Sequence, residues 1–445
     1  NQIILSDFME EHQINIRMFR PMESYQKYGG VLTFARSVGY AVVKKPEGYT
    51  TAKVDQIIQE YEKKSANEQQ STAKQYPNII TVVNETFADI KVLGDFKTNE
   101  DYMPYFHSLK KNCVTGYTYA SIVGGQTANT EFELLTGNTL GFLSAGTTAF
   151  QLYIHGQMPS LVSNLKAEGY SGNKAMHPFN PYNYNRPAVY KDFGFTDFID
   201  KFDFPKNVKR VREYISDEAN VDRIISEYEK NRKKTDQPFY MYNMTIQNHS
   251  PYDKDAANFK QPIKIESSKY DAEANRYLNL IKYSDDSLKQ LTGYFEKCKE
   301  PTIILFLGDH QPRLTDEFMN KITNGQYQTW NSEQMMKRYQ VPFVIWANYD
   351  IKEQHIEKTS MNYIQSILTK TAGVKMTGYQ RFLNEVRKEV PTITSQGYWG
   401  KNGKFYQIND KGSPYYGIIQ KYRMIQYNMM FDKKNRRDSF FEVSK

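Results

Sequence analysis

Short runs of apolar, β-branched and aromatic residues recur through the middle of the chain and alternate with stretches of helical periodicity. Fully apolar short runs of this kind are typical of strands that are buried on both faces of a sheet. The expected strands cover 79–83, 239–246, 302–307 and 341–347, and the expected helices between them include 209–229 and 273–297. The alternation predicts an α/β domain with a largely parallel central sheet flanked by helices.

The first 75 residues have a different pattern. Val54, Ile57, Ile58 and Tyr61 have the i, i+3, i+4, i+7 spacing of one apolar helix face, and the polar run at 63–75 is typical of a linker. We therefore expect an N-terminal helical and linker segment over 1–75, followed by the α/β domain over 76–375.

The pattern changes again after residue 375. Residues 397–410 resemble a hairpin around Lys401-Asn402-Gly403, because Asn-Gly is the strongest two-residue turn signal. A helix rich in Tyr and Met is expected at 414–431. Residues 376–445 are thus predicted to form a small C-terminal α+β subdomain with antiparallel strands.

Composition narrows the class of protein. Hydrophobic residues make up 39% and charged residues 24% of the 445 residues, as in globular proteins with a full core. The net charge of +8 is spread over the chain, without the basic stripe of a nucleic-acid-binding protein. The two cysteines, Cys113 and Cys298, form no CxxC pair, so a cysteine zinc site is excluded, while a disulfide between them stays open.

Polar side chains follow three of the predicted strands. Glu85 comes after the first, His249 after the second, and Asp309 and His310 after the third. Ligands of parallel sheets bind beyond the carboxyl ends of the strands, so we expect these side chains to lie close together. Two carboxylates and an imidazole suit one divalent cation such as Mn²⁺, and also Mg²⁺ or Zn²⁺. Taken alone, Asp309-His310 is equally compatible with a turn that caps a helix.

Thr127 lies at the end of a glycine turn, in the stretch GGQTANTEFE, directly before a segment with helical spacing. One interpretation is that Thr127 is the N-cap of that helix. The other is that it is a nucleophile and a fourth metal ligand, in the positive field of the helix start. A hydroxyl is a poor nucleophile at neutral pH, and a metal lowers the pKa of an oxygen that it binds.

Several other chemistries lack their motifs. The chain contains no GxxxxGK[ST] phosphate loop, no HExxH pair and no GxSxG elbow, and its glycines are too scattered for a dinucleotide fingerprint.

Four short motifs stand in order along the chain: NETF, GGQTANTEFE, NHSPY and GDHQP. Together they resemble the extracellular catalytic domain of the lipoteichoic acid synthase family, which are phosphoglycerol transferases of the sulfatase and alkaline phosphatase superfamily. The resemblance covers about 76–375 and implies a sulfatase-like fold.

The resemblance also implies roles for particular residues. Thr127 matches the nucleophile, and the implied metal ligands are Glu85, Thr127, Asp309 and His310. The implied substrate-binding residues are His249 of NHSPY and His177, Tyr184 and Arg186 of HPFNPYNYNR. Without the resemblance, His177 reads as a loop histidine beside prolines.

The chain departs from the family's pattern at three places. Tyr184 stands where the best-known members have Trp, and Gln311-Pro312 differs from the residues that follow GDH in those members. Cys113 lacks the Pro and Arg of the C/S-x-P-x-R context of true sulfatases, so sulfatase activity is not expected. These departures leave the acceptor of the reaction open.

The expected function is a metal-dependent phosphoglycerol transferase with a phospho-threonine intermediate. Its expected partners are a phosphatidylglycerol-type lipid donor, a glycerol phosphate polymer or glycan acceptor and the membrane surface, but no nucleic acid. We expect a monomeric domain at the extracellular face of a bacterial membrane, anchored by an N-terminal membrane region absent from this chain or released by cleavage. The alternatives are a phosphodiesterase or phosphatase of the same superfamily, and a catalytically idle binding domain of the cell envelope.

Overall fold

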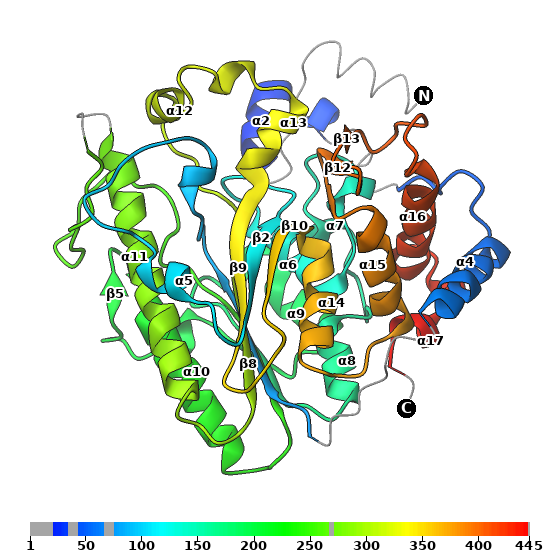
Figure 1. Cartoon of the computed structure of the whole chain (residues 1–445), viewed down its shortest axis with the longest axis horizontal. Coiled ribbons are helices and arrows are strands. Elements are labelled where there is room, and N and C mark those ends of the chain that lie inside the picture. The colour runs from blue at the N-terminus through cyan, green and yellow to red at the C-terminus, as the bar shows by residue number, and fades with distance from the viewer. Residues whose placement is uncertain (1–20, 34–42, 66–74, 267–270, 444–445) are drawn as a thin grey trace.

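A mixed sheet of eight strands passes through the centre of the molecule, and helices cover both of its faces (Figure 1). The computed structural model of the chain describes residues 21–33, 43–65, 75–266 and 271–443. The strands of the sheet are β1 (Asn78–Asn84), β2 (Cys113–Tyr119), β3 (Ser171–Met176), β4 (Asp197–Ile199), β7 (Phe239–Met244), β8 (Thr302–Gly308), β9 (Gln340–Ala347) and β10 (Gln354–Ser360). Their spatial order is β10-β2-β9-β8-β1-β7-β3-β4, and β9 alone among them is antiparallel to its neighbours.

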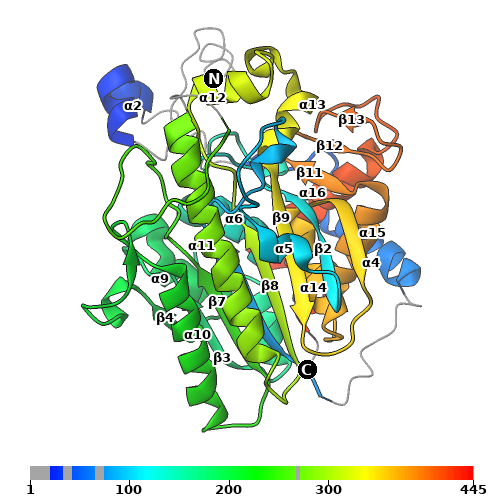
Figure 2. The same cartoon turned by 60° about the vertical axis from the view of Figure 1, so that its left-hand side comes forward.

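Two apolar clusters lie on the two sides of this sheet. In β1, Ile79 and Val83 belong to one cluster and Ile80 and Val82 to the other, as the alternation of side chains along a strand requires. The second cluster is completed by α5 (Pro104–Ser108), α10 (Asp217–Arg232), α11 (Ala272–Phe295) and α12 (Asp316–Ile322). Figure 2 shows α10 and α11 side by side on this face of the sheet. Burial on both faces explains why the central strands are continuous apolar runs.

The first cluster is larger. Its helices are α4 (Thr51–Lys64), α6 (Thr127–Thr136), α7 (Ala149–Leu152), α8 (Leu161–Ala167), α9 (Arg186–Phe193), α14 (Met361–Thr371), α15 (Gly378–Glu389), α16 (Tyr416–Met430) and α17 (Asp438–Phe441). The helices that lie apart from these are α2 (Pro21–Tyr28) and α13 (Ser332–Met335). Helices from all three predicted parts of the chain thus share one core, and the division at residues 75 and 375 stays a prediction.

The predicted fold class is confirmed: a largely parallel sheet flanked by helices, with a small antiparallel sheet near the C-terminus. That second sheet contains β11 (Thr392–Thr394), β12 (Gly397–Trp399) and β13 (Phe405–Tyr406), and the predicted turn at Asn402-Gly403 joins the last two. The predicted N-terminal helix is α4, whose Val54, Ile57 and Tyr61 are buried, while part of the predicted linker lies outside the described residues.

One predicted helix begins later than expected. Residues 209–215 do not continue α10 toward its N-terminus but form a two-stranded hairpin, β5 (Arg210–Val211) and β6 (Tyr214–Ile215). Arg212 takes a left-handed backbone conformation with φ of 55°, which ends any helix at this point. Ser216 then caps α10 by accepting a hydrogen bond from the backbone N–H of Ala219.

The register of the sheet brings the ends of its central strands together. Asn84 of β1 is paired with Gly308 of β8, and Val83 with Met244 of β7, all in parallel. The residues that directly follow these strands therefore emerge at one edge of the sheet. Gly308 is required at this edge, because a Cβ atom there would lie 1.8 Å from the carbonyl oxygen of Phe87.

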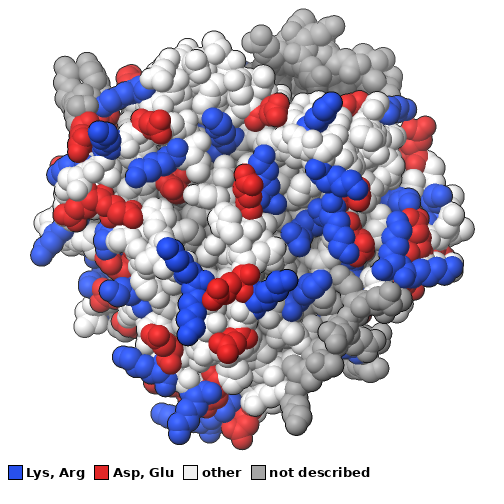
Figure 3. Space-filling model, in the orientation of Figure 1, with Lys and Arg blue, Asp and Glu red and all other residues white. Residues whose placement is uncertain are grey.

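Charge and apolar length add two observations. On the face drawn in Figure 3, Lys and Arg side chains are interspersed with Asp and Glu, in line with the modest net charge of the chain. Of the helices that the described ranges contain, none has the length and apolar content needed to cross a lipid bilayer.

The two cysteines do not form a disulfide: Cys113 is buried, Cys298 is half-buried, and both are free thiols.

Candidate active site

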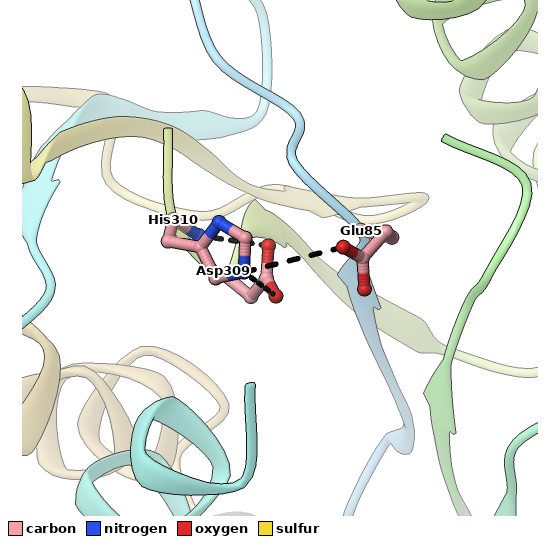
Figure 4. Close-up of side chains that lie close together, drawn as sticks. All are labelled: Glu85, Asp309 and His310. Atoms are coloured by element: carbon pink, nitrogen blue, oxygen red, sulfur yellow. Dashed lines mark hydrogen bonds and ion pairs between the residues drawn. The ribbon is translucent and has the colours of Figure 1, made fainter. Parts of the chain in front are cut away.

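Three side chains that could hold a metal ion converge at the edge where β1 and β8 end (Figure 4). Glu85 follows β1, Asp309 and His310 follow β8, and one ligand atom from each lies within 4.8 Å of the others. All three side chains are buried, and this group is the sole such cluster in the described part of the chain. The strand register explains the convergence, since Glu85 and Asp309 each come directly after a paired residue.

The imidazole of His310 is held with one nitrogen free. Its Nδ1 lies 3.0 Å from the carbonyl oxygen of Gln311, which can only accept, so Nδ1 carries the proton. Nε2 is therefore an acceptor, and it lies 3.1 Å from Oδ2 of Asp309 and 4.0 Å from Oε1 of Glu85. Nε2 is buried and makes no hydrogen bond to any described residue. Acceptor atoms that face one another in this way fit a cation between them.

The carboxyl of Asp309 is fixed from the opposite side. Its Oδ1 accepts hydrogen bonds from the backbone N–H groups of Thr86 and His310, each at 2.7 Å, which leaves Oδ2 directed at the cluster. Burial, and then the neighbouring Asp309 carboxylate, raise the pKa of Glu85 to about 8. Two carboxylates enclosed in one site repel each other unless a cation compensates them. The donor set thus fits a divalent metal ion.

Thr127 points at this cluster. Its hydroxyl donates to Oδ2 of Asp309 at 2.9 Å, and the residue is 7% exposed. Thr127 is the first residue of α6, so it is not the N-cap; that position belongs to Gln126, whose side chain caps nothing. Gly124, Gly125 and Gln126 all have positive φ values, so this turn depends on glycine. The interpretation of Thr127 as a helix cap is therefore wrong, and its hydroxyl faces the cluster of Glu85, Asp309 and His310.

A pocket of about 450 Å³ opens above the cluster. The predicted site residues in its lining are Glu85, Thr127, His177, Tyr184, Arg186, His249 and His310. Asp309 lies behind them, fully buried. The structure thus brings all the predicted site residues to one place.

One side of the pocket comes from the segment between β3 and α9. His177 directly follows β3, and its Nδ1 contacts the carbonyl oxygen of Met244, which leaves Nε2 as an acceptor. Burial, and then the charge of Arg186, hold the pKa of His177 well below its usual value of 6.5. Tyr184 has a φ of 60°, which is uncommon for a bulky residue, and its ring centre lies 5.1 Å from the guanidinium carbon of Arg186.

His249 lies on the loop that follows β7. Its Nδ1 is 2.7 Å from the carbonyl oxygen of Ser250, and the Ser250–Pro251 peptide bond is cis. Burial lowers the pKa of His249 below 6.5. Arg212 holds the loop by donating to the carbonyl oxygens of Gln247, His249 and Pro251 at 2.7–2.8 Å.

Sequence reasoning missed several residues that build this site. Glu131 is fully buried and forms an ion pair with Arg186 at 2.7 Å, although it stands in the same motif as Thr127. Beneath the cluster, the amide of Asn248 donates to Oδ1 of Asn84 and to the backbone oxygen of Glu85, and Asn84 donates to Asp217. The spacing of four residues between Thr127 and Glu131, one helical turn, was the available signal for Glu131.

This geometry agrees with comparisons to known proteins. Residues 77–374, more than half of the chain, match the sequence model of the sulfatase family, and the chain therefore belongs to the sulfatase family. The fold and the buried acidic and imidazole cluster make it an enzyme of the sulfatase and alkaline phosphatase superfamily.

Two solved structures share the fold. The phosphoglycerol transferase GacH of Streptococcus pyogenes, solved with sn-glycerol-1-phosphate, matches with a TM-score of 0.72 at 20% identity, over 90% of this chain and 100% of that one. The lipoteichoic acid synthase LtaP of Listeria monocytogenes matches with a TM-score of 0.61 at 20% identity, over 87% of this chain and 98% of that one.

Two relatives are similar in sequence. A Rhizobium meliloti protein with the provisional name cyclic beta-1,2-glucan modification protein is 30% identical over 433 residues, 96% of this chain and 65% of its own length. The lipoteichoic acid synthase-like YvgJ of Bacillus subtilis is 27% identical over 240 residues, 52% of this chain and 36% of its own length. The chain spans less than two thirds of the length of either relative.

Proposed function

We propose that the chain is a metal-dependent phosphoglycerol transferase that acts at the extracellular face of a bacterial membrane. It moves glycerol phosphate from a phosphatidylglycerol-type lipid to a glycan or a glycerol phosphate polymer. The observation that carries this proposal is the hydroxyl of Thr127, held 2.9 Å from Asp309 in the buried cluster at the base of a pocket that also presents Arg186.

The proposed metal ligands are Glu85, Thr127, Asp309 and His310, and the proposed ion is Mn²⁺. When bound, a divalent ion would lower the pKa of the Thr127 hydroxyl and offset charge on the phosphoryl oxygens. The chain's own groups set the geometry: Thr86 and His310 hold Asp309 through their backbone N–H groups, and Gln311 fixes the tautomer of His310.

The proposed reaction has two steps. In the first, ionised Thr127 forms a bond from its oxygen to phosphorus, and the bond from phosphorus to the diacylglycerol oxygen breaks. That oxygen takes a proton from solvent, diacylglycerol leaves, and glycerol phosphate stays on Thr127. In the second, the oxygen of an acceptor hydroxyl attacks phosphorus, the bond to Thr127 breaks, and the acceptor's proton passes to Nε2 of His249 and then to solvent.

His177, His249 and Arg186 have separate roles in the proposed reaction. His177 and His249 stay neutral at physiological pH because burial lowers their pKa values, so each offers an Nε2 acceptor to a hydroxyl of the glycerol or the acceptor. Arg186 donates to the phosphoryl oxygens, where charge develops in the transition state. The name of the Rhizobium meliloti relative makes a cyclic glucan the first acceptor to try.

The test is a product analysis with matched variants. The protein is incubated with Mn²⁺ and phosphatidylglycerol in vesicles, with and without a cyclic glucan, and the released diacylglycerol and the phosphorylated glucan are quantified. We expect release of diacylglycerol, transfer to the glucan, and a glycerophosphoryl adduct on Thr127 that intact-protein mass spectrometry detects.

Thr127→Ala should lower the rate of both products by at least ~1000-fold, because Thr127 supplies the hydroxyl among the proposed metal ligands. Thr136→Ala is the matched control, since the Thr136 hydroxyl on the same helix bonds only within α6 and its flank, to Phe132 and Asn138. Full activity of Thr127→Ala would refute the proposal. Release of free glycerol phosphate that no acceptor suppresses would instead identify a phosphodiesterase of the same superfamily.

A further inference from the structure

Helix α6 carries a buried carboxylate outside the cluster, that of Glu131, one helical turn after Thr127. Glu131 is fully buried on α6, and residues four positions apart lie on the same side of a helix. No step of the proposed reaction uses Glu131. An ionisable group placed so deep must be paired, because an isolated buried charge is very costly.

Four hydrogen bonds satisfy this carboxylate. Oε1 accepts from Nε and Nη2 of Arg186 at 3.1 and 2.7 Å. Oε2 accepts from the hydroxyls of Tyr190 and Tyr242 at 2.5 and 3.1 Å. Tyr190 lies on α9 together with Arg186, and Tyr242 lies on β7, so Glu131 connects three elements behind the wall of the pocket.

The pairing decides which part of Arg186 reaches the pocket. The Nε and Nη2 side of the guanidinium is taken by Glu131, and the ring of Tyr184 lies 5.1 Å from its carbon atom. The hydrogen bonds of Arg186 to Glu131 use Nε and Nη2, and Arg186 lines the pocket. Arg186 therefore offers a restricted set of donors, and the adjacent carboxylate balances its charge.

The pairing of Arg186 with Glu131 affects which ligand charge the pocket prefers. A phosphodiester carries one negative charge, whereas a phosphate monoester carries nearly two at neutral pH. An unbalanced buried cation would attract the doubly charged ligand more strongly, through the Coulomb energy of the extra charge. A guanidinium whose charge is balanced loses most of that preference and keeps its directional hydrogen bonds.

We propose that Glu131 is a positioning residue that orients Arg186 and makes the pocket select singly charged phosphodiesters over doubly charged phosphate monoesters. This inference rests on the proposed function and names the substrate class of the same site.

The test compares two ligands at pH 7.5 with saturating Mn²⁺. Glycerol phosphate is the monoester, bis-glycerol phosphate is the diester, and calorimetry gives the dissociation constant of each. In Glu131→Gln the ratio of monoester affinity to diester affinity should rise by ~10-fold or more, because the uncharged amide no longer balances Arg186. An unchanged ratio would overturn the inference.

Glu133→Gln is the matched control. Glu133 is also buried on α6, but it accepts hydrogen bonds from Ser121, Thr139 and Leu140 and makes no contact with Arg186. Its substitution should leave the ratio as in the wild type. An equal rise of the ratio in Glu133→Gln would also overturn the inference, because the effect would then not act through Arg186.

A second pair of variants covers the case in which Glu131→Gln does not fold. Arg186→Met leaves Glu131 buried without its cation, and Glu131→Met/Arg186→Met removes both charges, which proteins tolerate better than the loss of one. The double variant should bind the monoester at least ~10-fold more tightly than Arg186→Met does. Equal affinities would refute the inference, whereas a wild type that neither binds the diester nor cleaves phosphatidylglycerol would refute the proposed function itself.

Discussion

The pocket has two walls that are built in different ways. We call the wall of Glu85, Thr127, Asp309 and His310 the nucleophile wall, after the proposed role of Thr127. We call the wall of His177, Tyr184, Arg186 and His249 the recognition wall, after their proposed roles. In the nucleophile wall, main-chain geometry sets the side chains: strand register places Glu85 and Asp309, and backbone N–H groups hold the Asp309 carboxyl. In the recognition wall, side-chain contacts set the geometry: Arg212 holds the loop of His249, and Glu131 holds Arg186.

The difference predicts that the two walls have different roles in the reaction. A side chain that is fixed by the pairing of central strands cannot move without a change in the core of the sheet, which suits chemistry that needs constant distances. A side chain on a loop can be replaced, or its loop rebuilt, while the sheet stays the same. We therefore expect substitutions in the nucleophile wall to abolish turnover, and substitutions in the recognition wall to change how well each substrate is used.

After Thr127→Ala, the largest effect is expected from the loss of a proposed metal ligand. Glu85→Gln removes one of the two carboxylates, and since loss of groups that merely support ligands already costs 10–100-fold in affinity, Mn²⁺ binding should weaken by at least ~100-fold. Calorimetric titration of Mn²⁺ into the metal-free protein measures this directly. Glu133→Gln should bind Mn²⁺ like the wild type, because Glu133 lies outside the cluster. Equal affinity for Mn²⁺ in Glu85→Gln and the wild type would show that the cluster is not the metal site.

A smaller effect, of a different kind, is expected at His249. His249→Asn should lower kcat/KM by ~100-fold, the typical contribution of a general base, and leave Mn²⁺ affinity unchanged. Only the neutral imidazole can take a proton, and burial lowers its pKa below 6.5, so wild-type activity should persist as the pH falls through 6.5 and decline only at lower pH. In His249→Asn this decline should shift or vanish. A wild-type decline centred above pH 6.5, or a variant that loses Mn²⁺, would contradict the assignment of His249 to the recognition wall.

The two walls also differ in how far the sequence alone predicts them. Glu85, Asp309 and His310 could be placed together because each directly follows an apolar strand, and the carboxyl ends of parallel strands meet at one edge. Tyr184 and Arg186 can be placed only through a family resemblance, because they lie where a connecting segment enters α9 and no periodicity marks them as part of a pocket. For Glu131 the sequence offers only its spacing of one helical turn from Thr127, because its partner Arg186 is 55 positions away.

The fold was predictable to a similar extent. The strands β1, β7, β8 and β9 lie in the middle of the sheet and have continuous apolar runs. The edge strand β10 was not expected, because its sequence QHIEKTS is polar and its first residues are exposed. The hairpin before α10 was read as helix, since only the conformation of Arg212 distinguishes the two. Local pattern thus identifies what is buried on both sides, and misses elements whose neighbours lie far away in the sequence.

The smallest effect is expected at Tyr184, where the recognition wall should tolerate exchange. The ring of Tyr184 lies over the guanidinium of Arg186, an interaction that Trp makes better than Tyr and that an aliphatic side chain does not make. Tyr184→Trp should keep kcat and KM for phosphatidylglycerol within ~2-fold, and Tyr184→Leu should raise KM by ~3- to 5-fold with kcat nearly unchanged, the loss of about 0.5–1 kcal/mol of cation–π energy. Steady-state kinetics at fixed Mn²⁺ separates the two parameters. A kcat for Tyr184→Leu that falls as far as that of Thr127→Ala would contradict the proposed difference between the two walls.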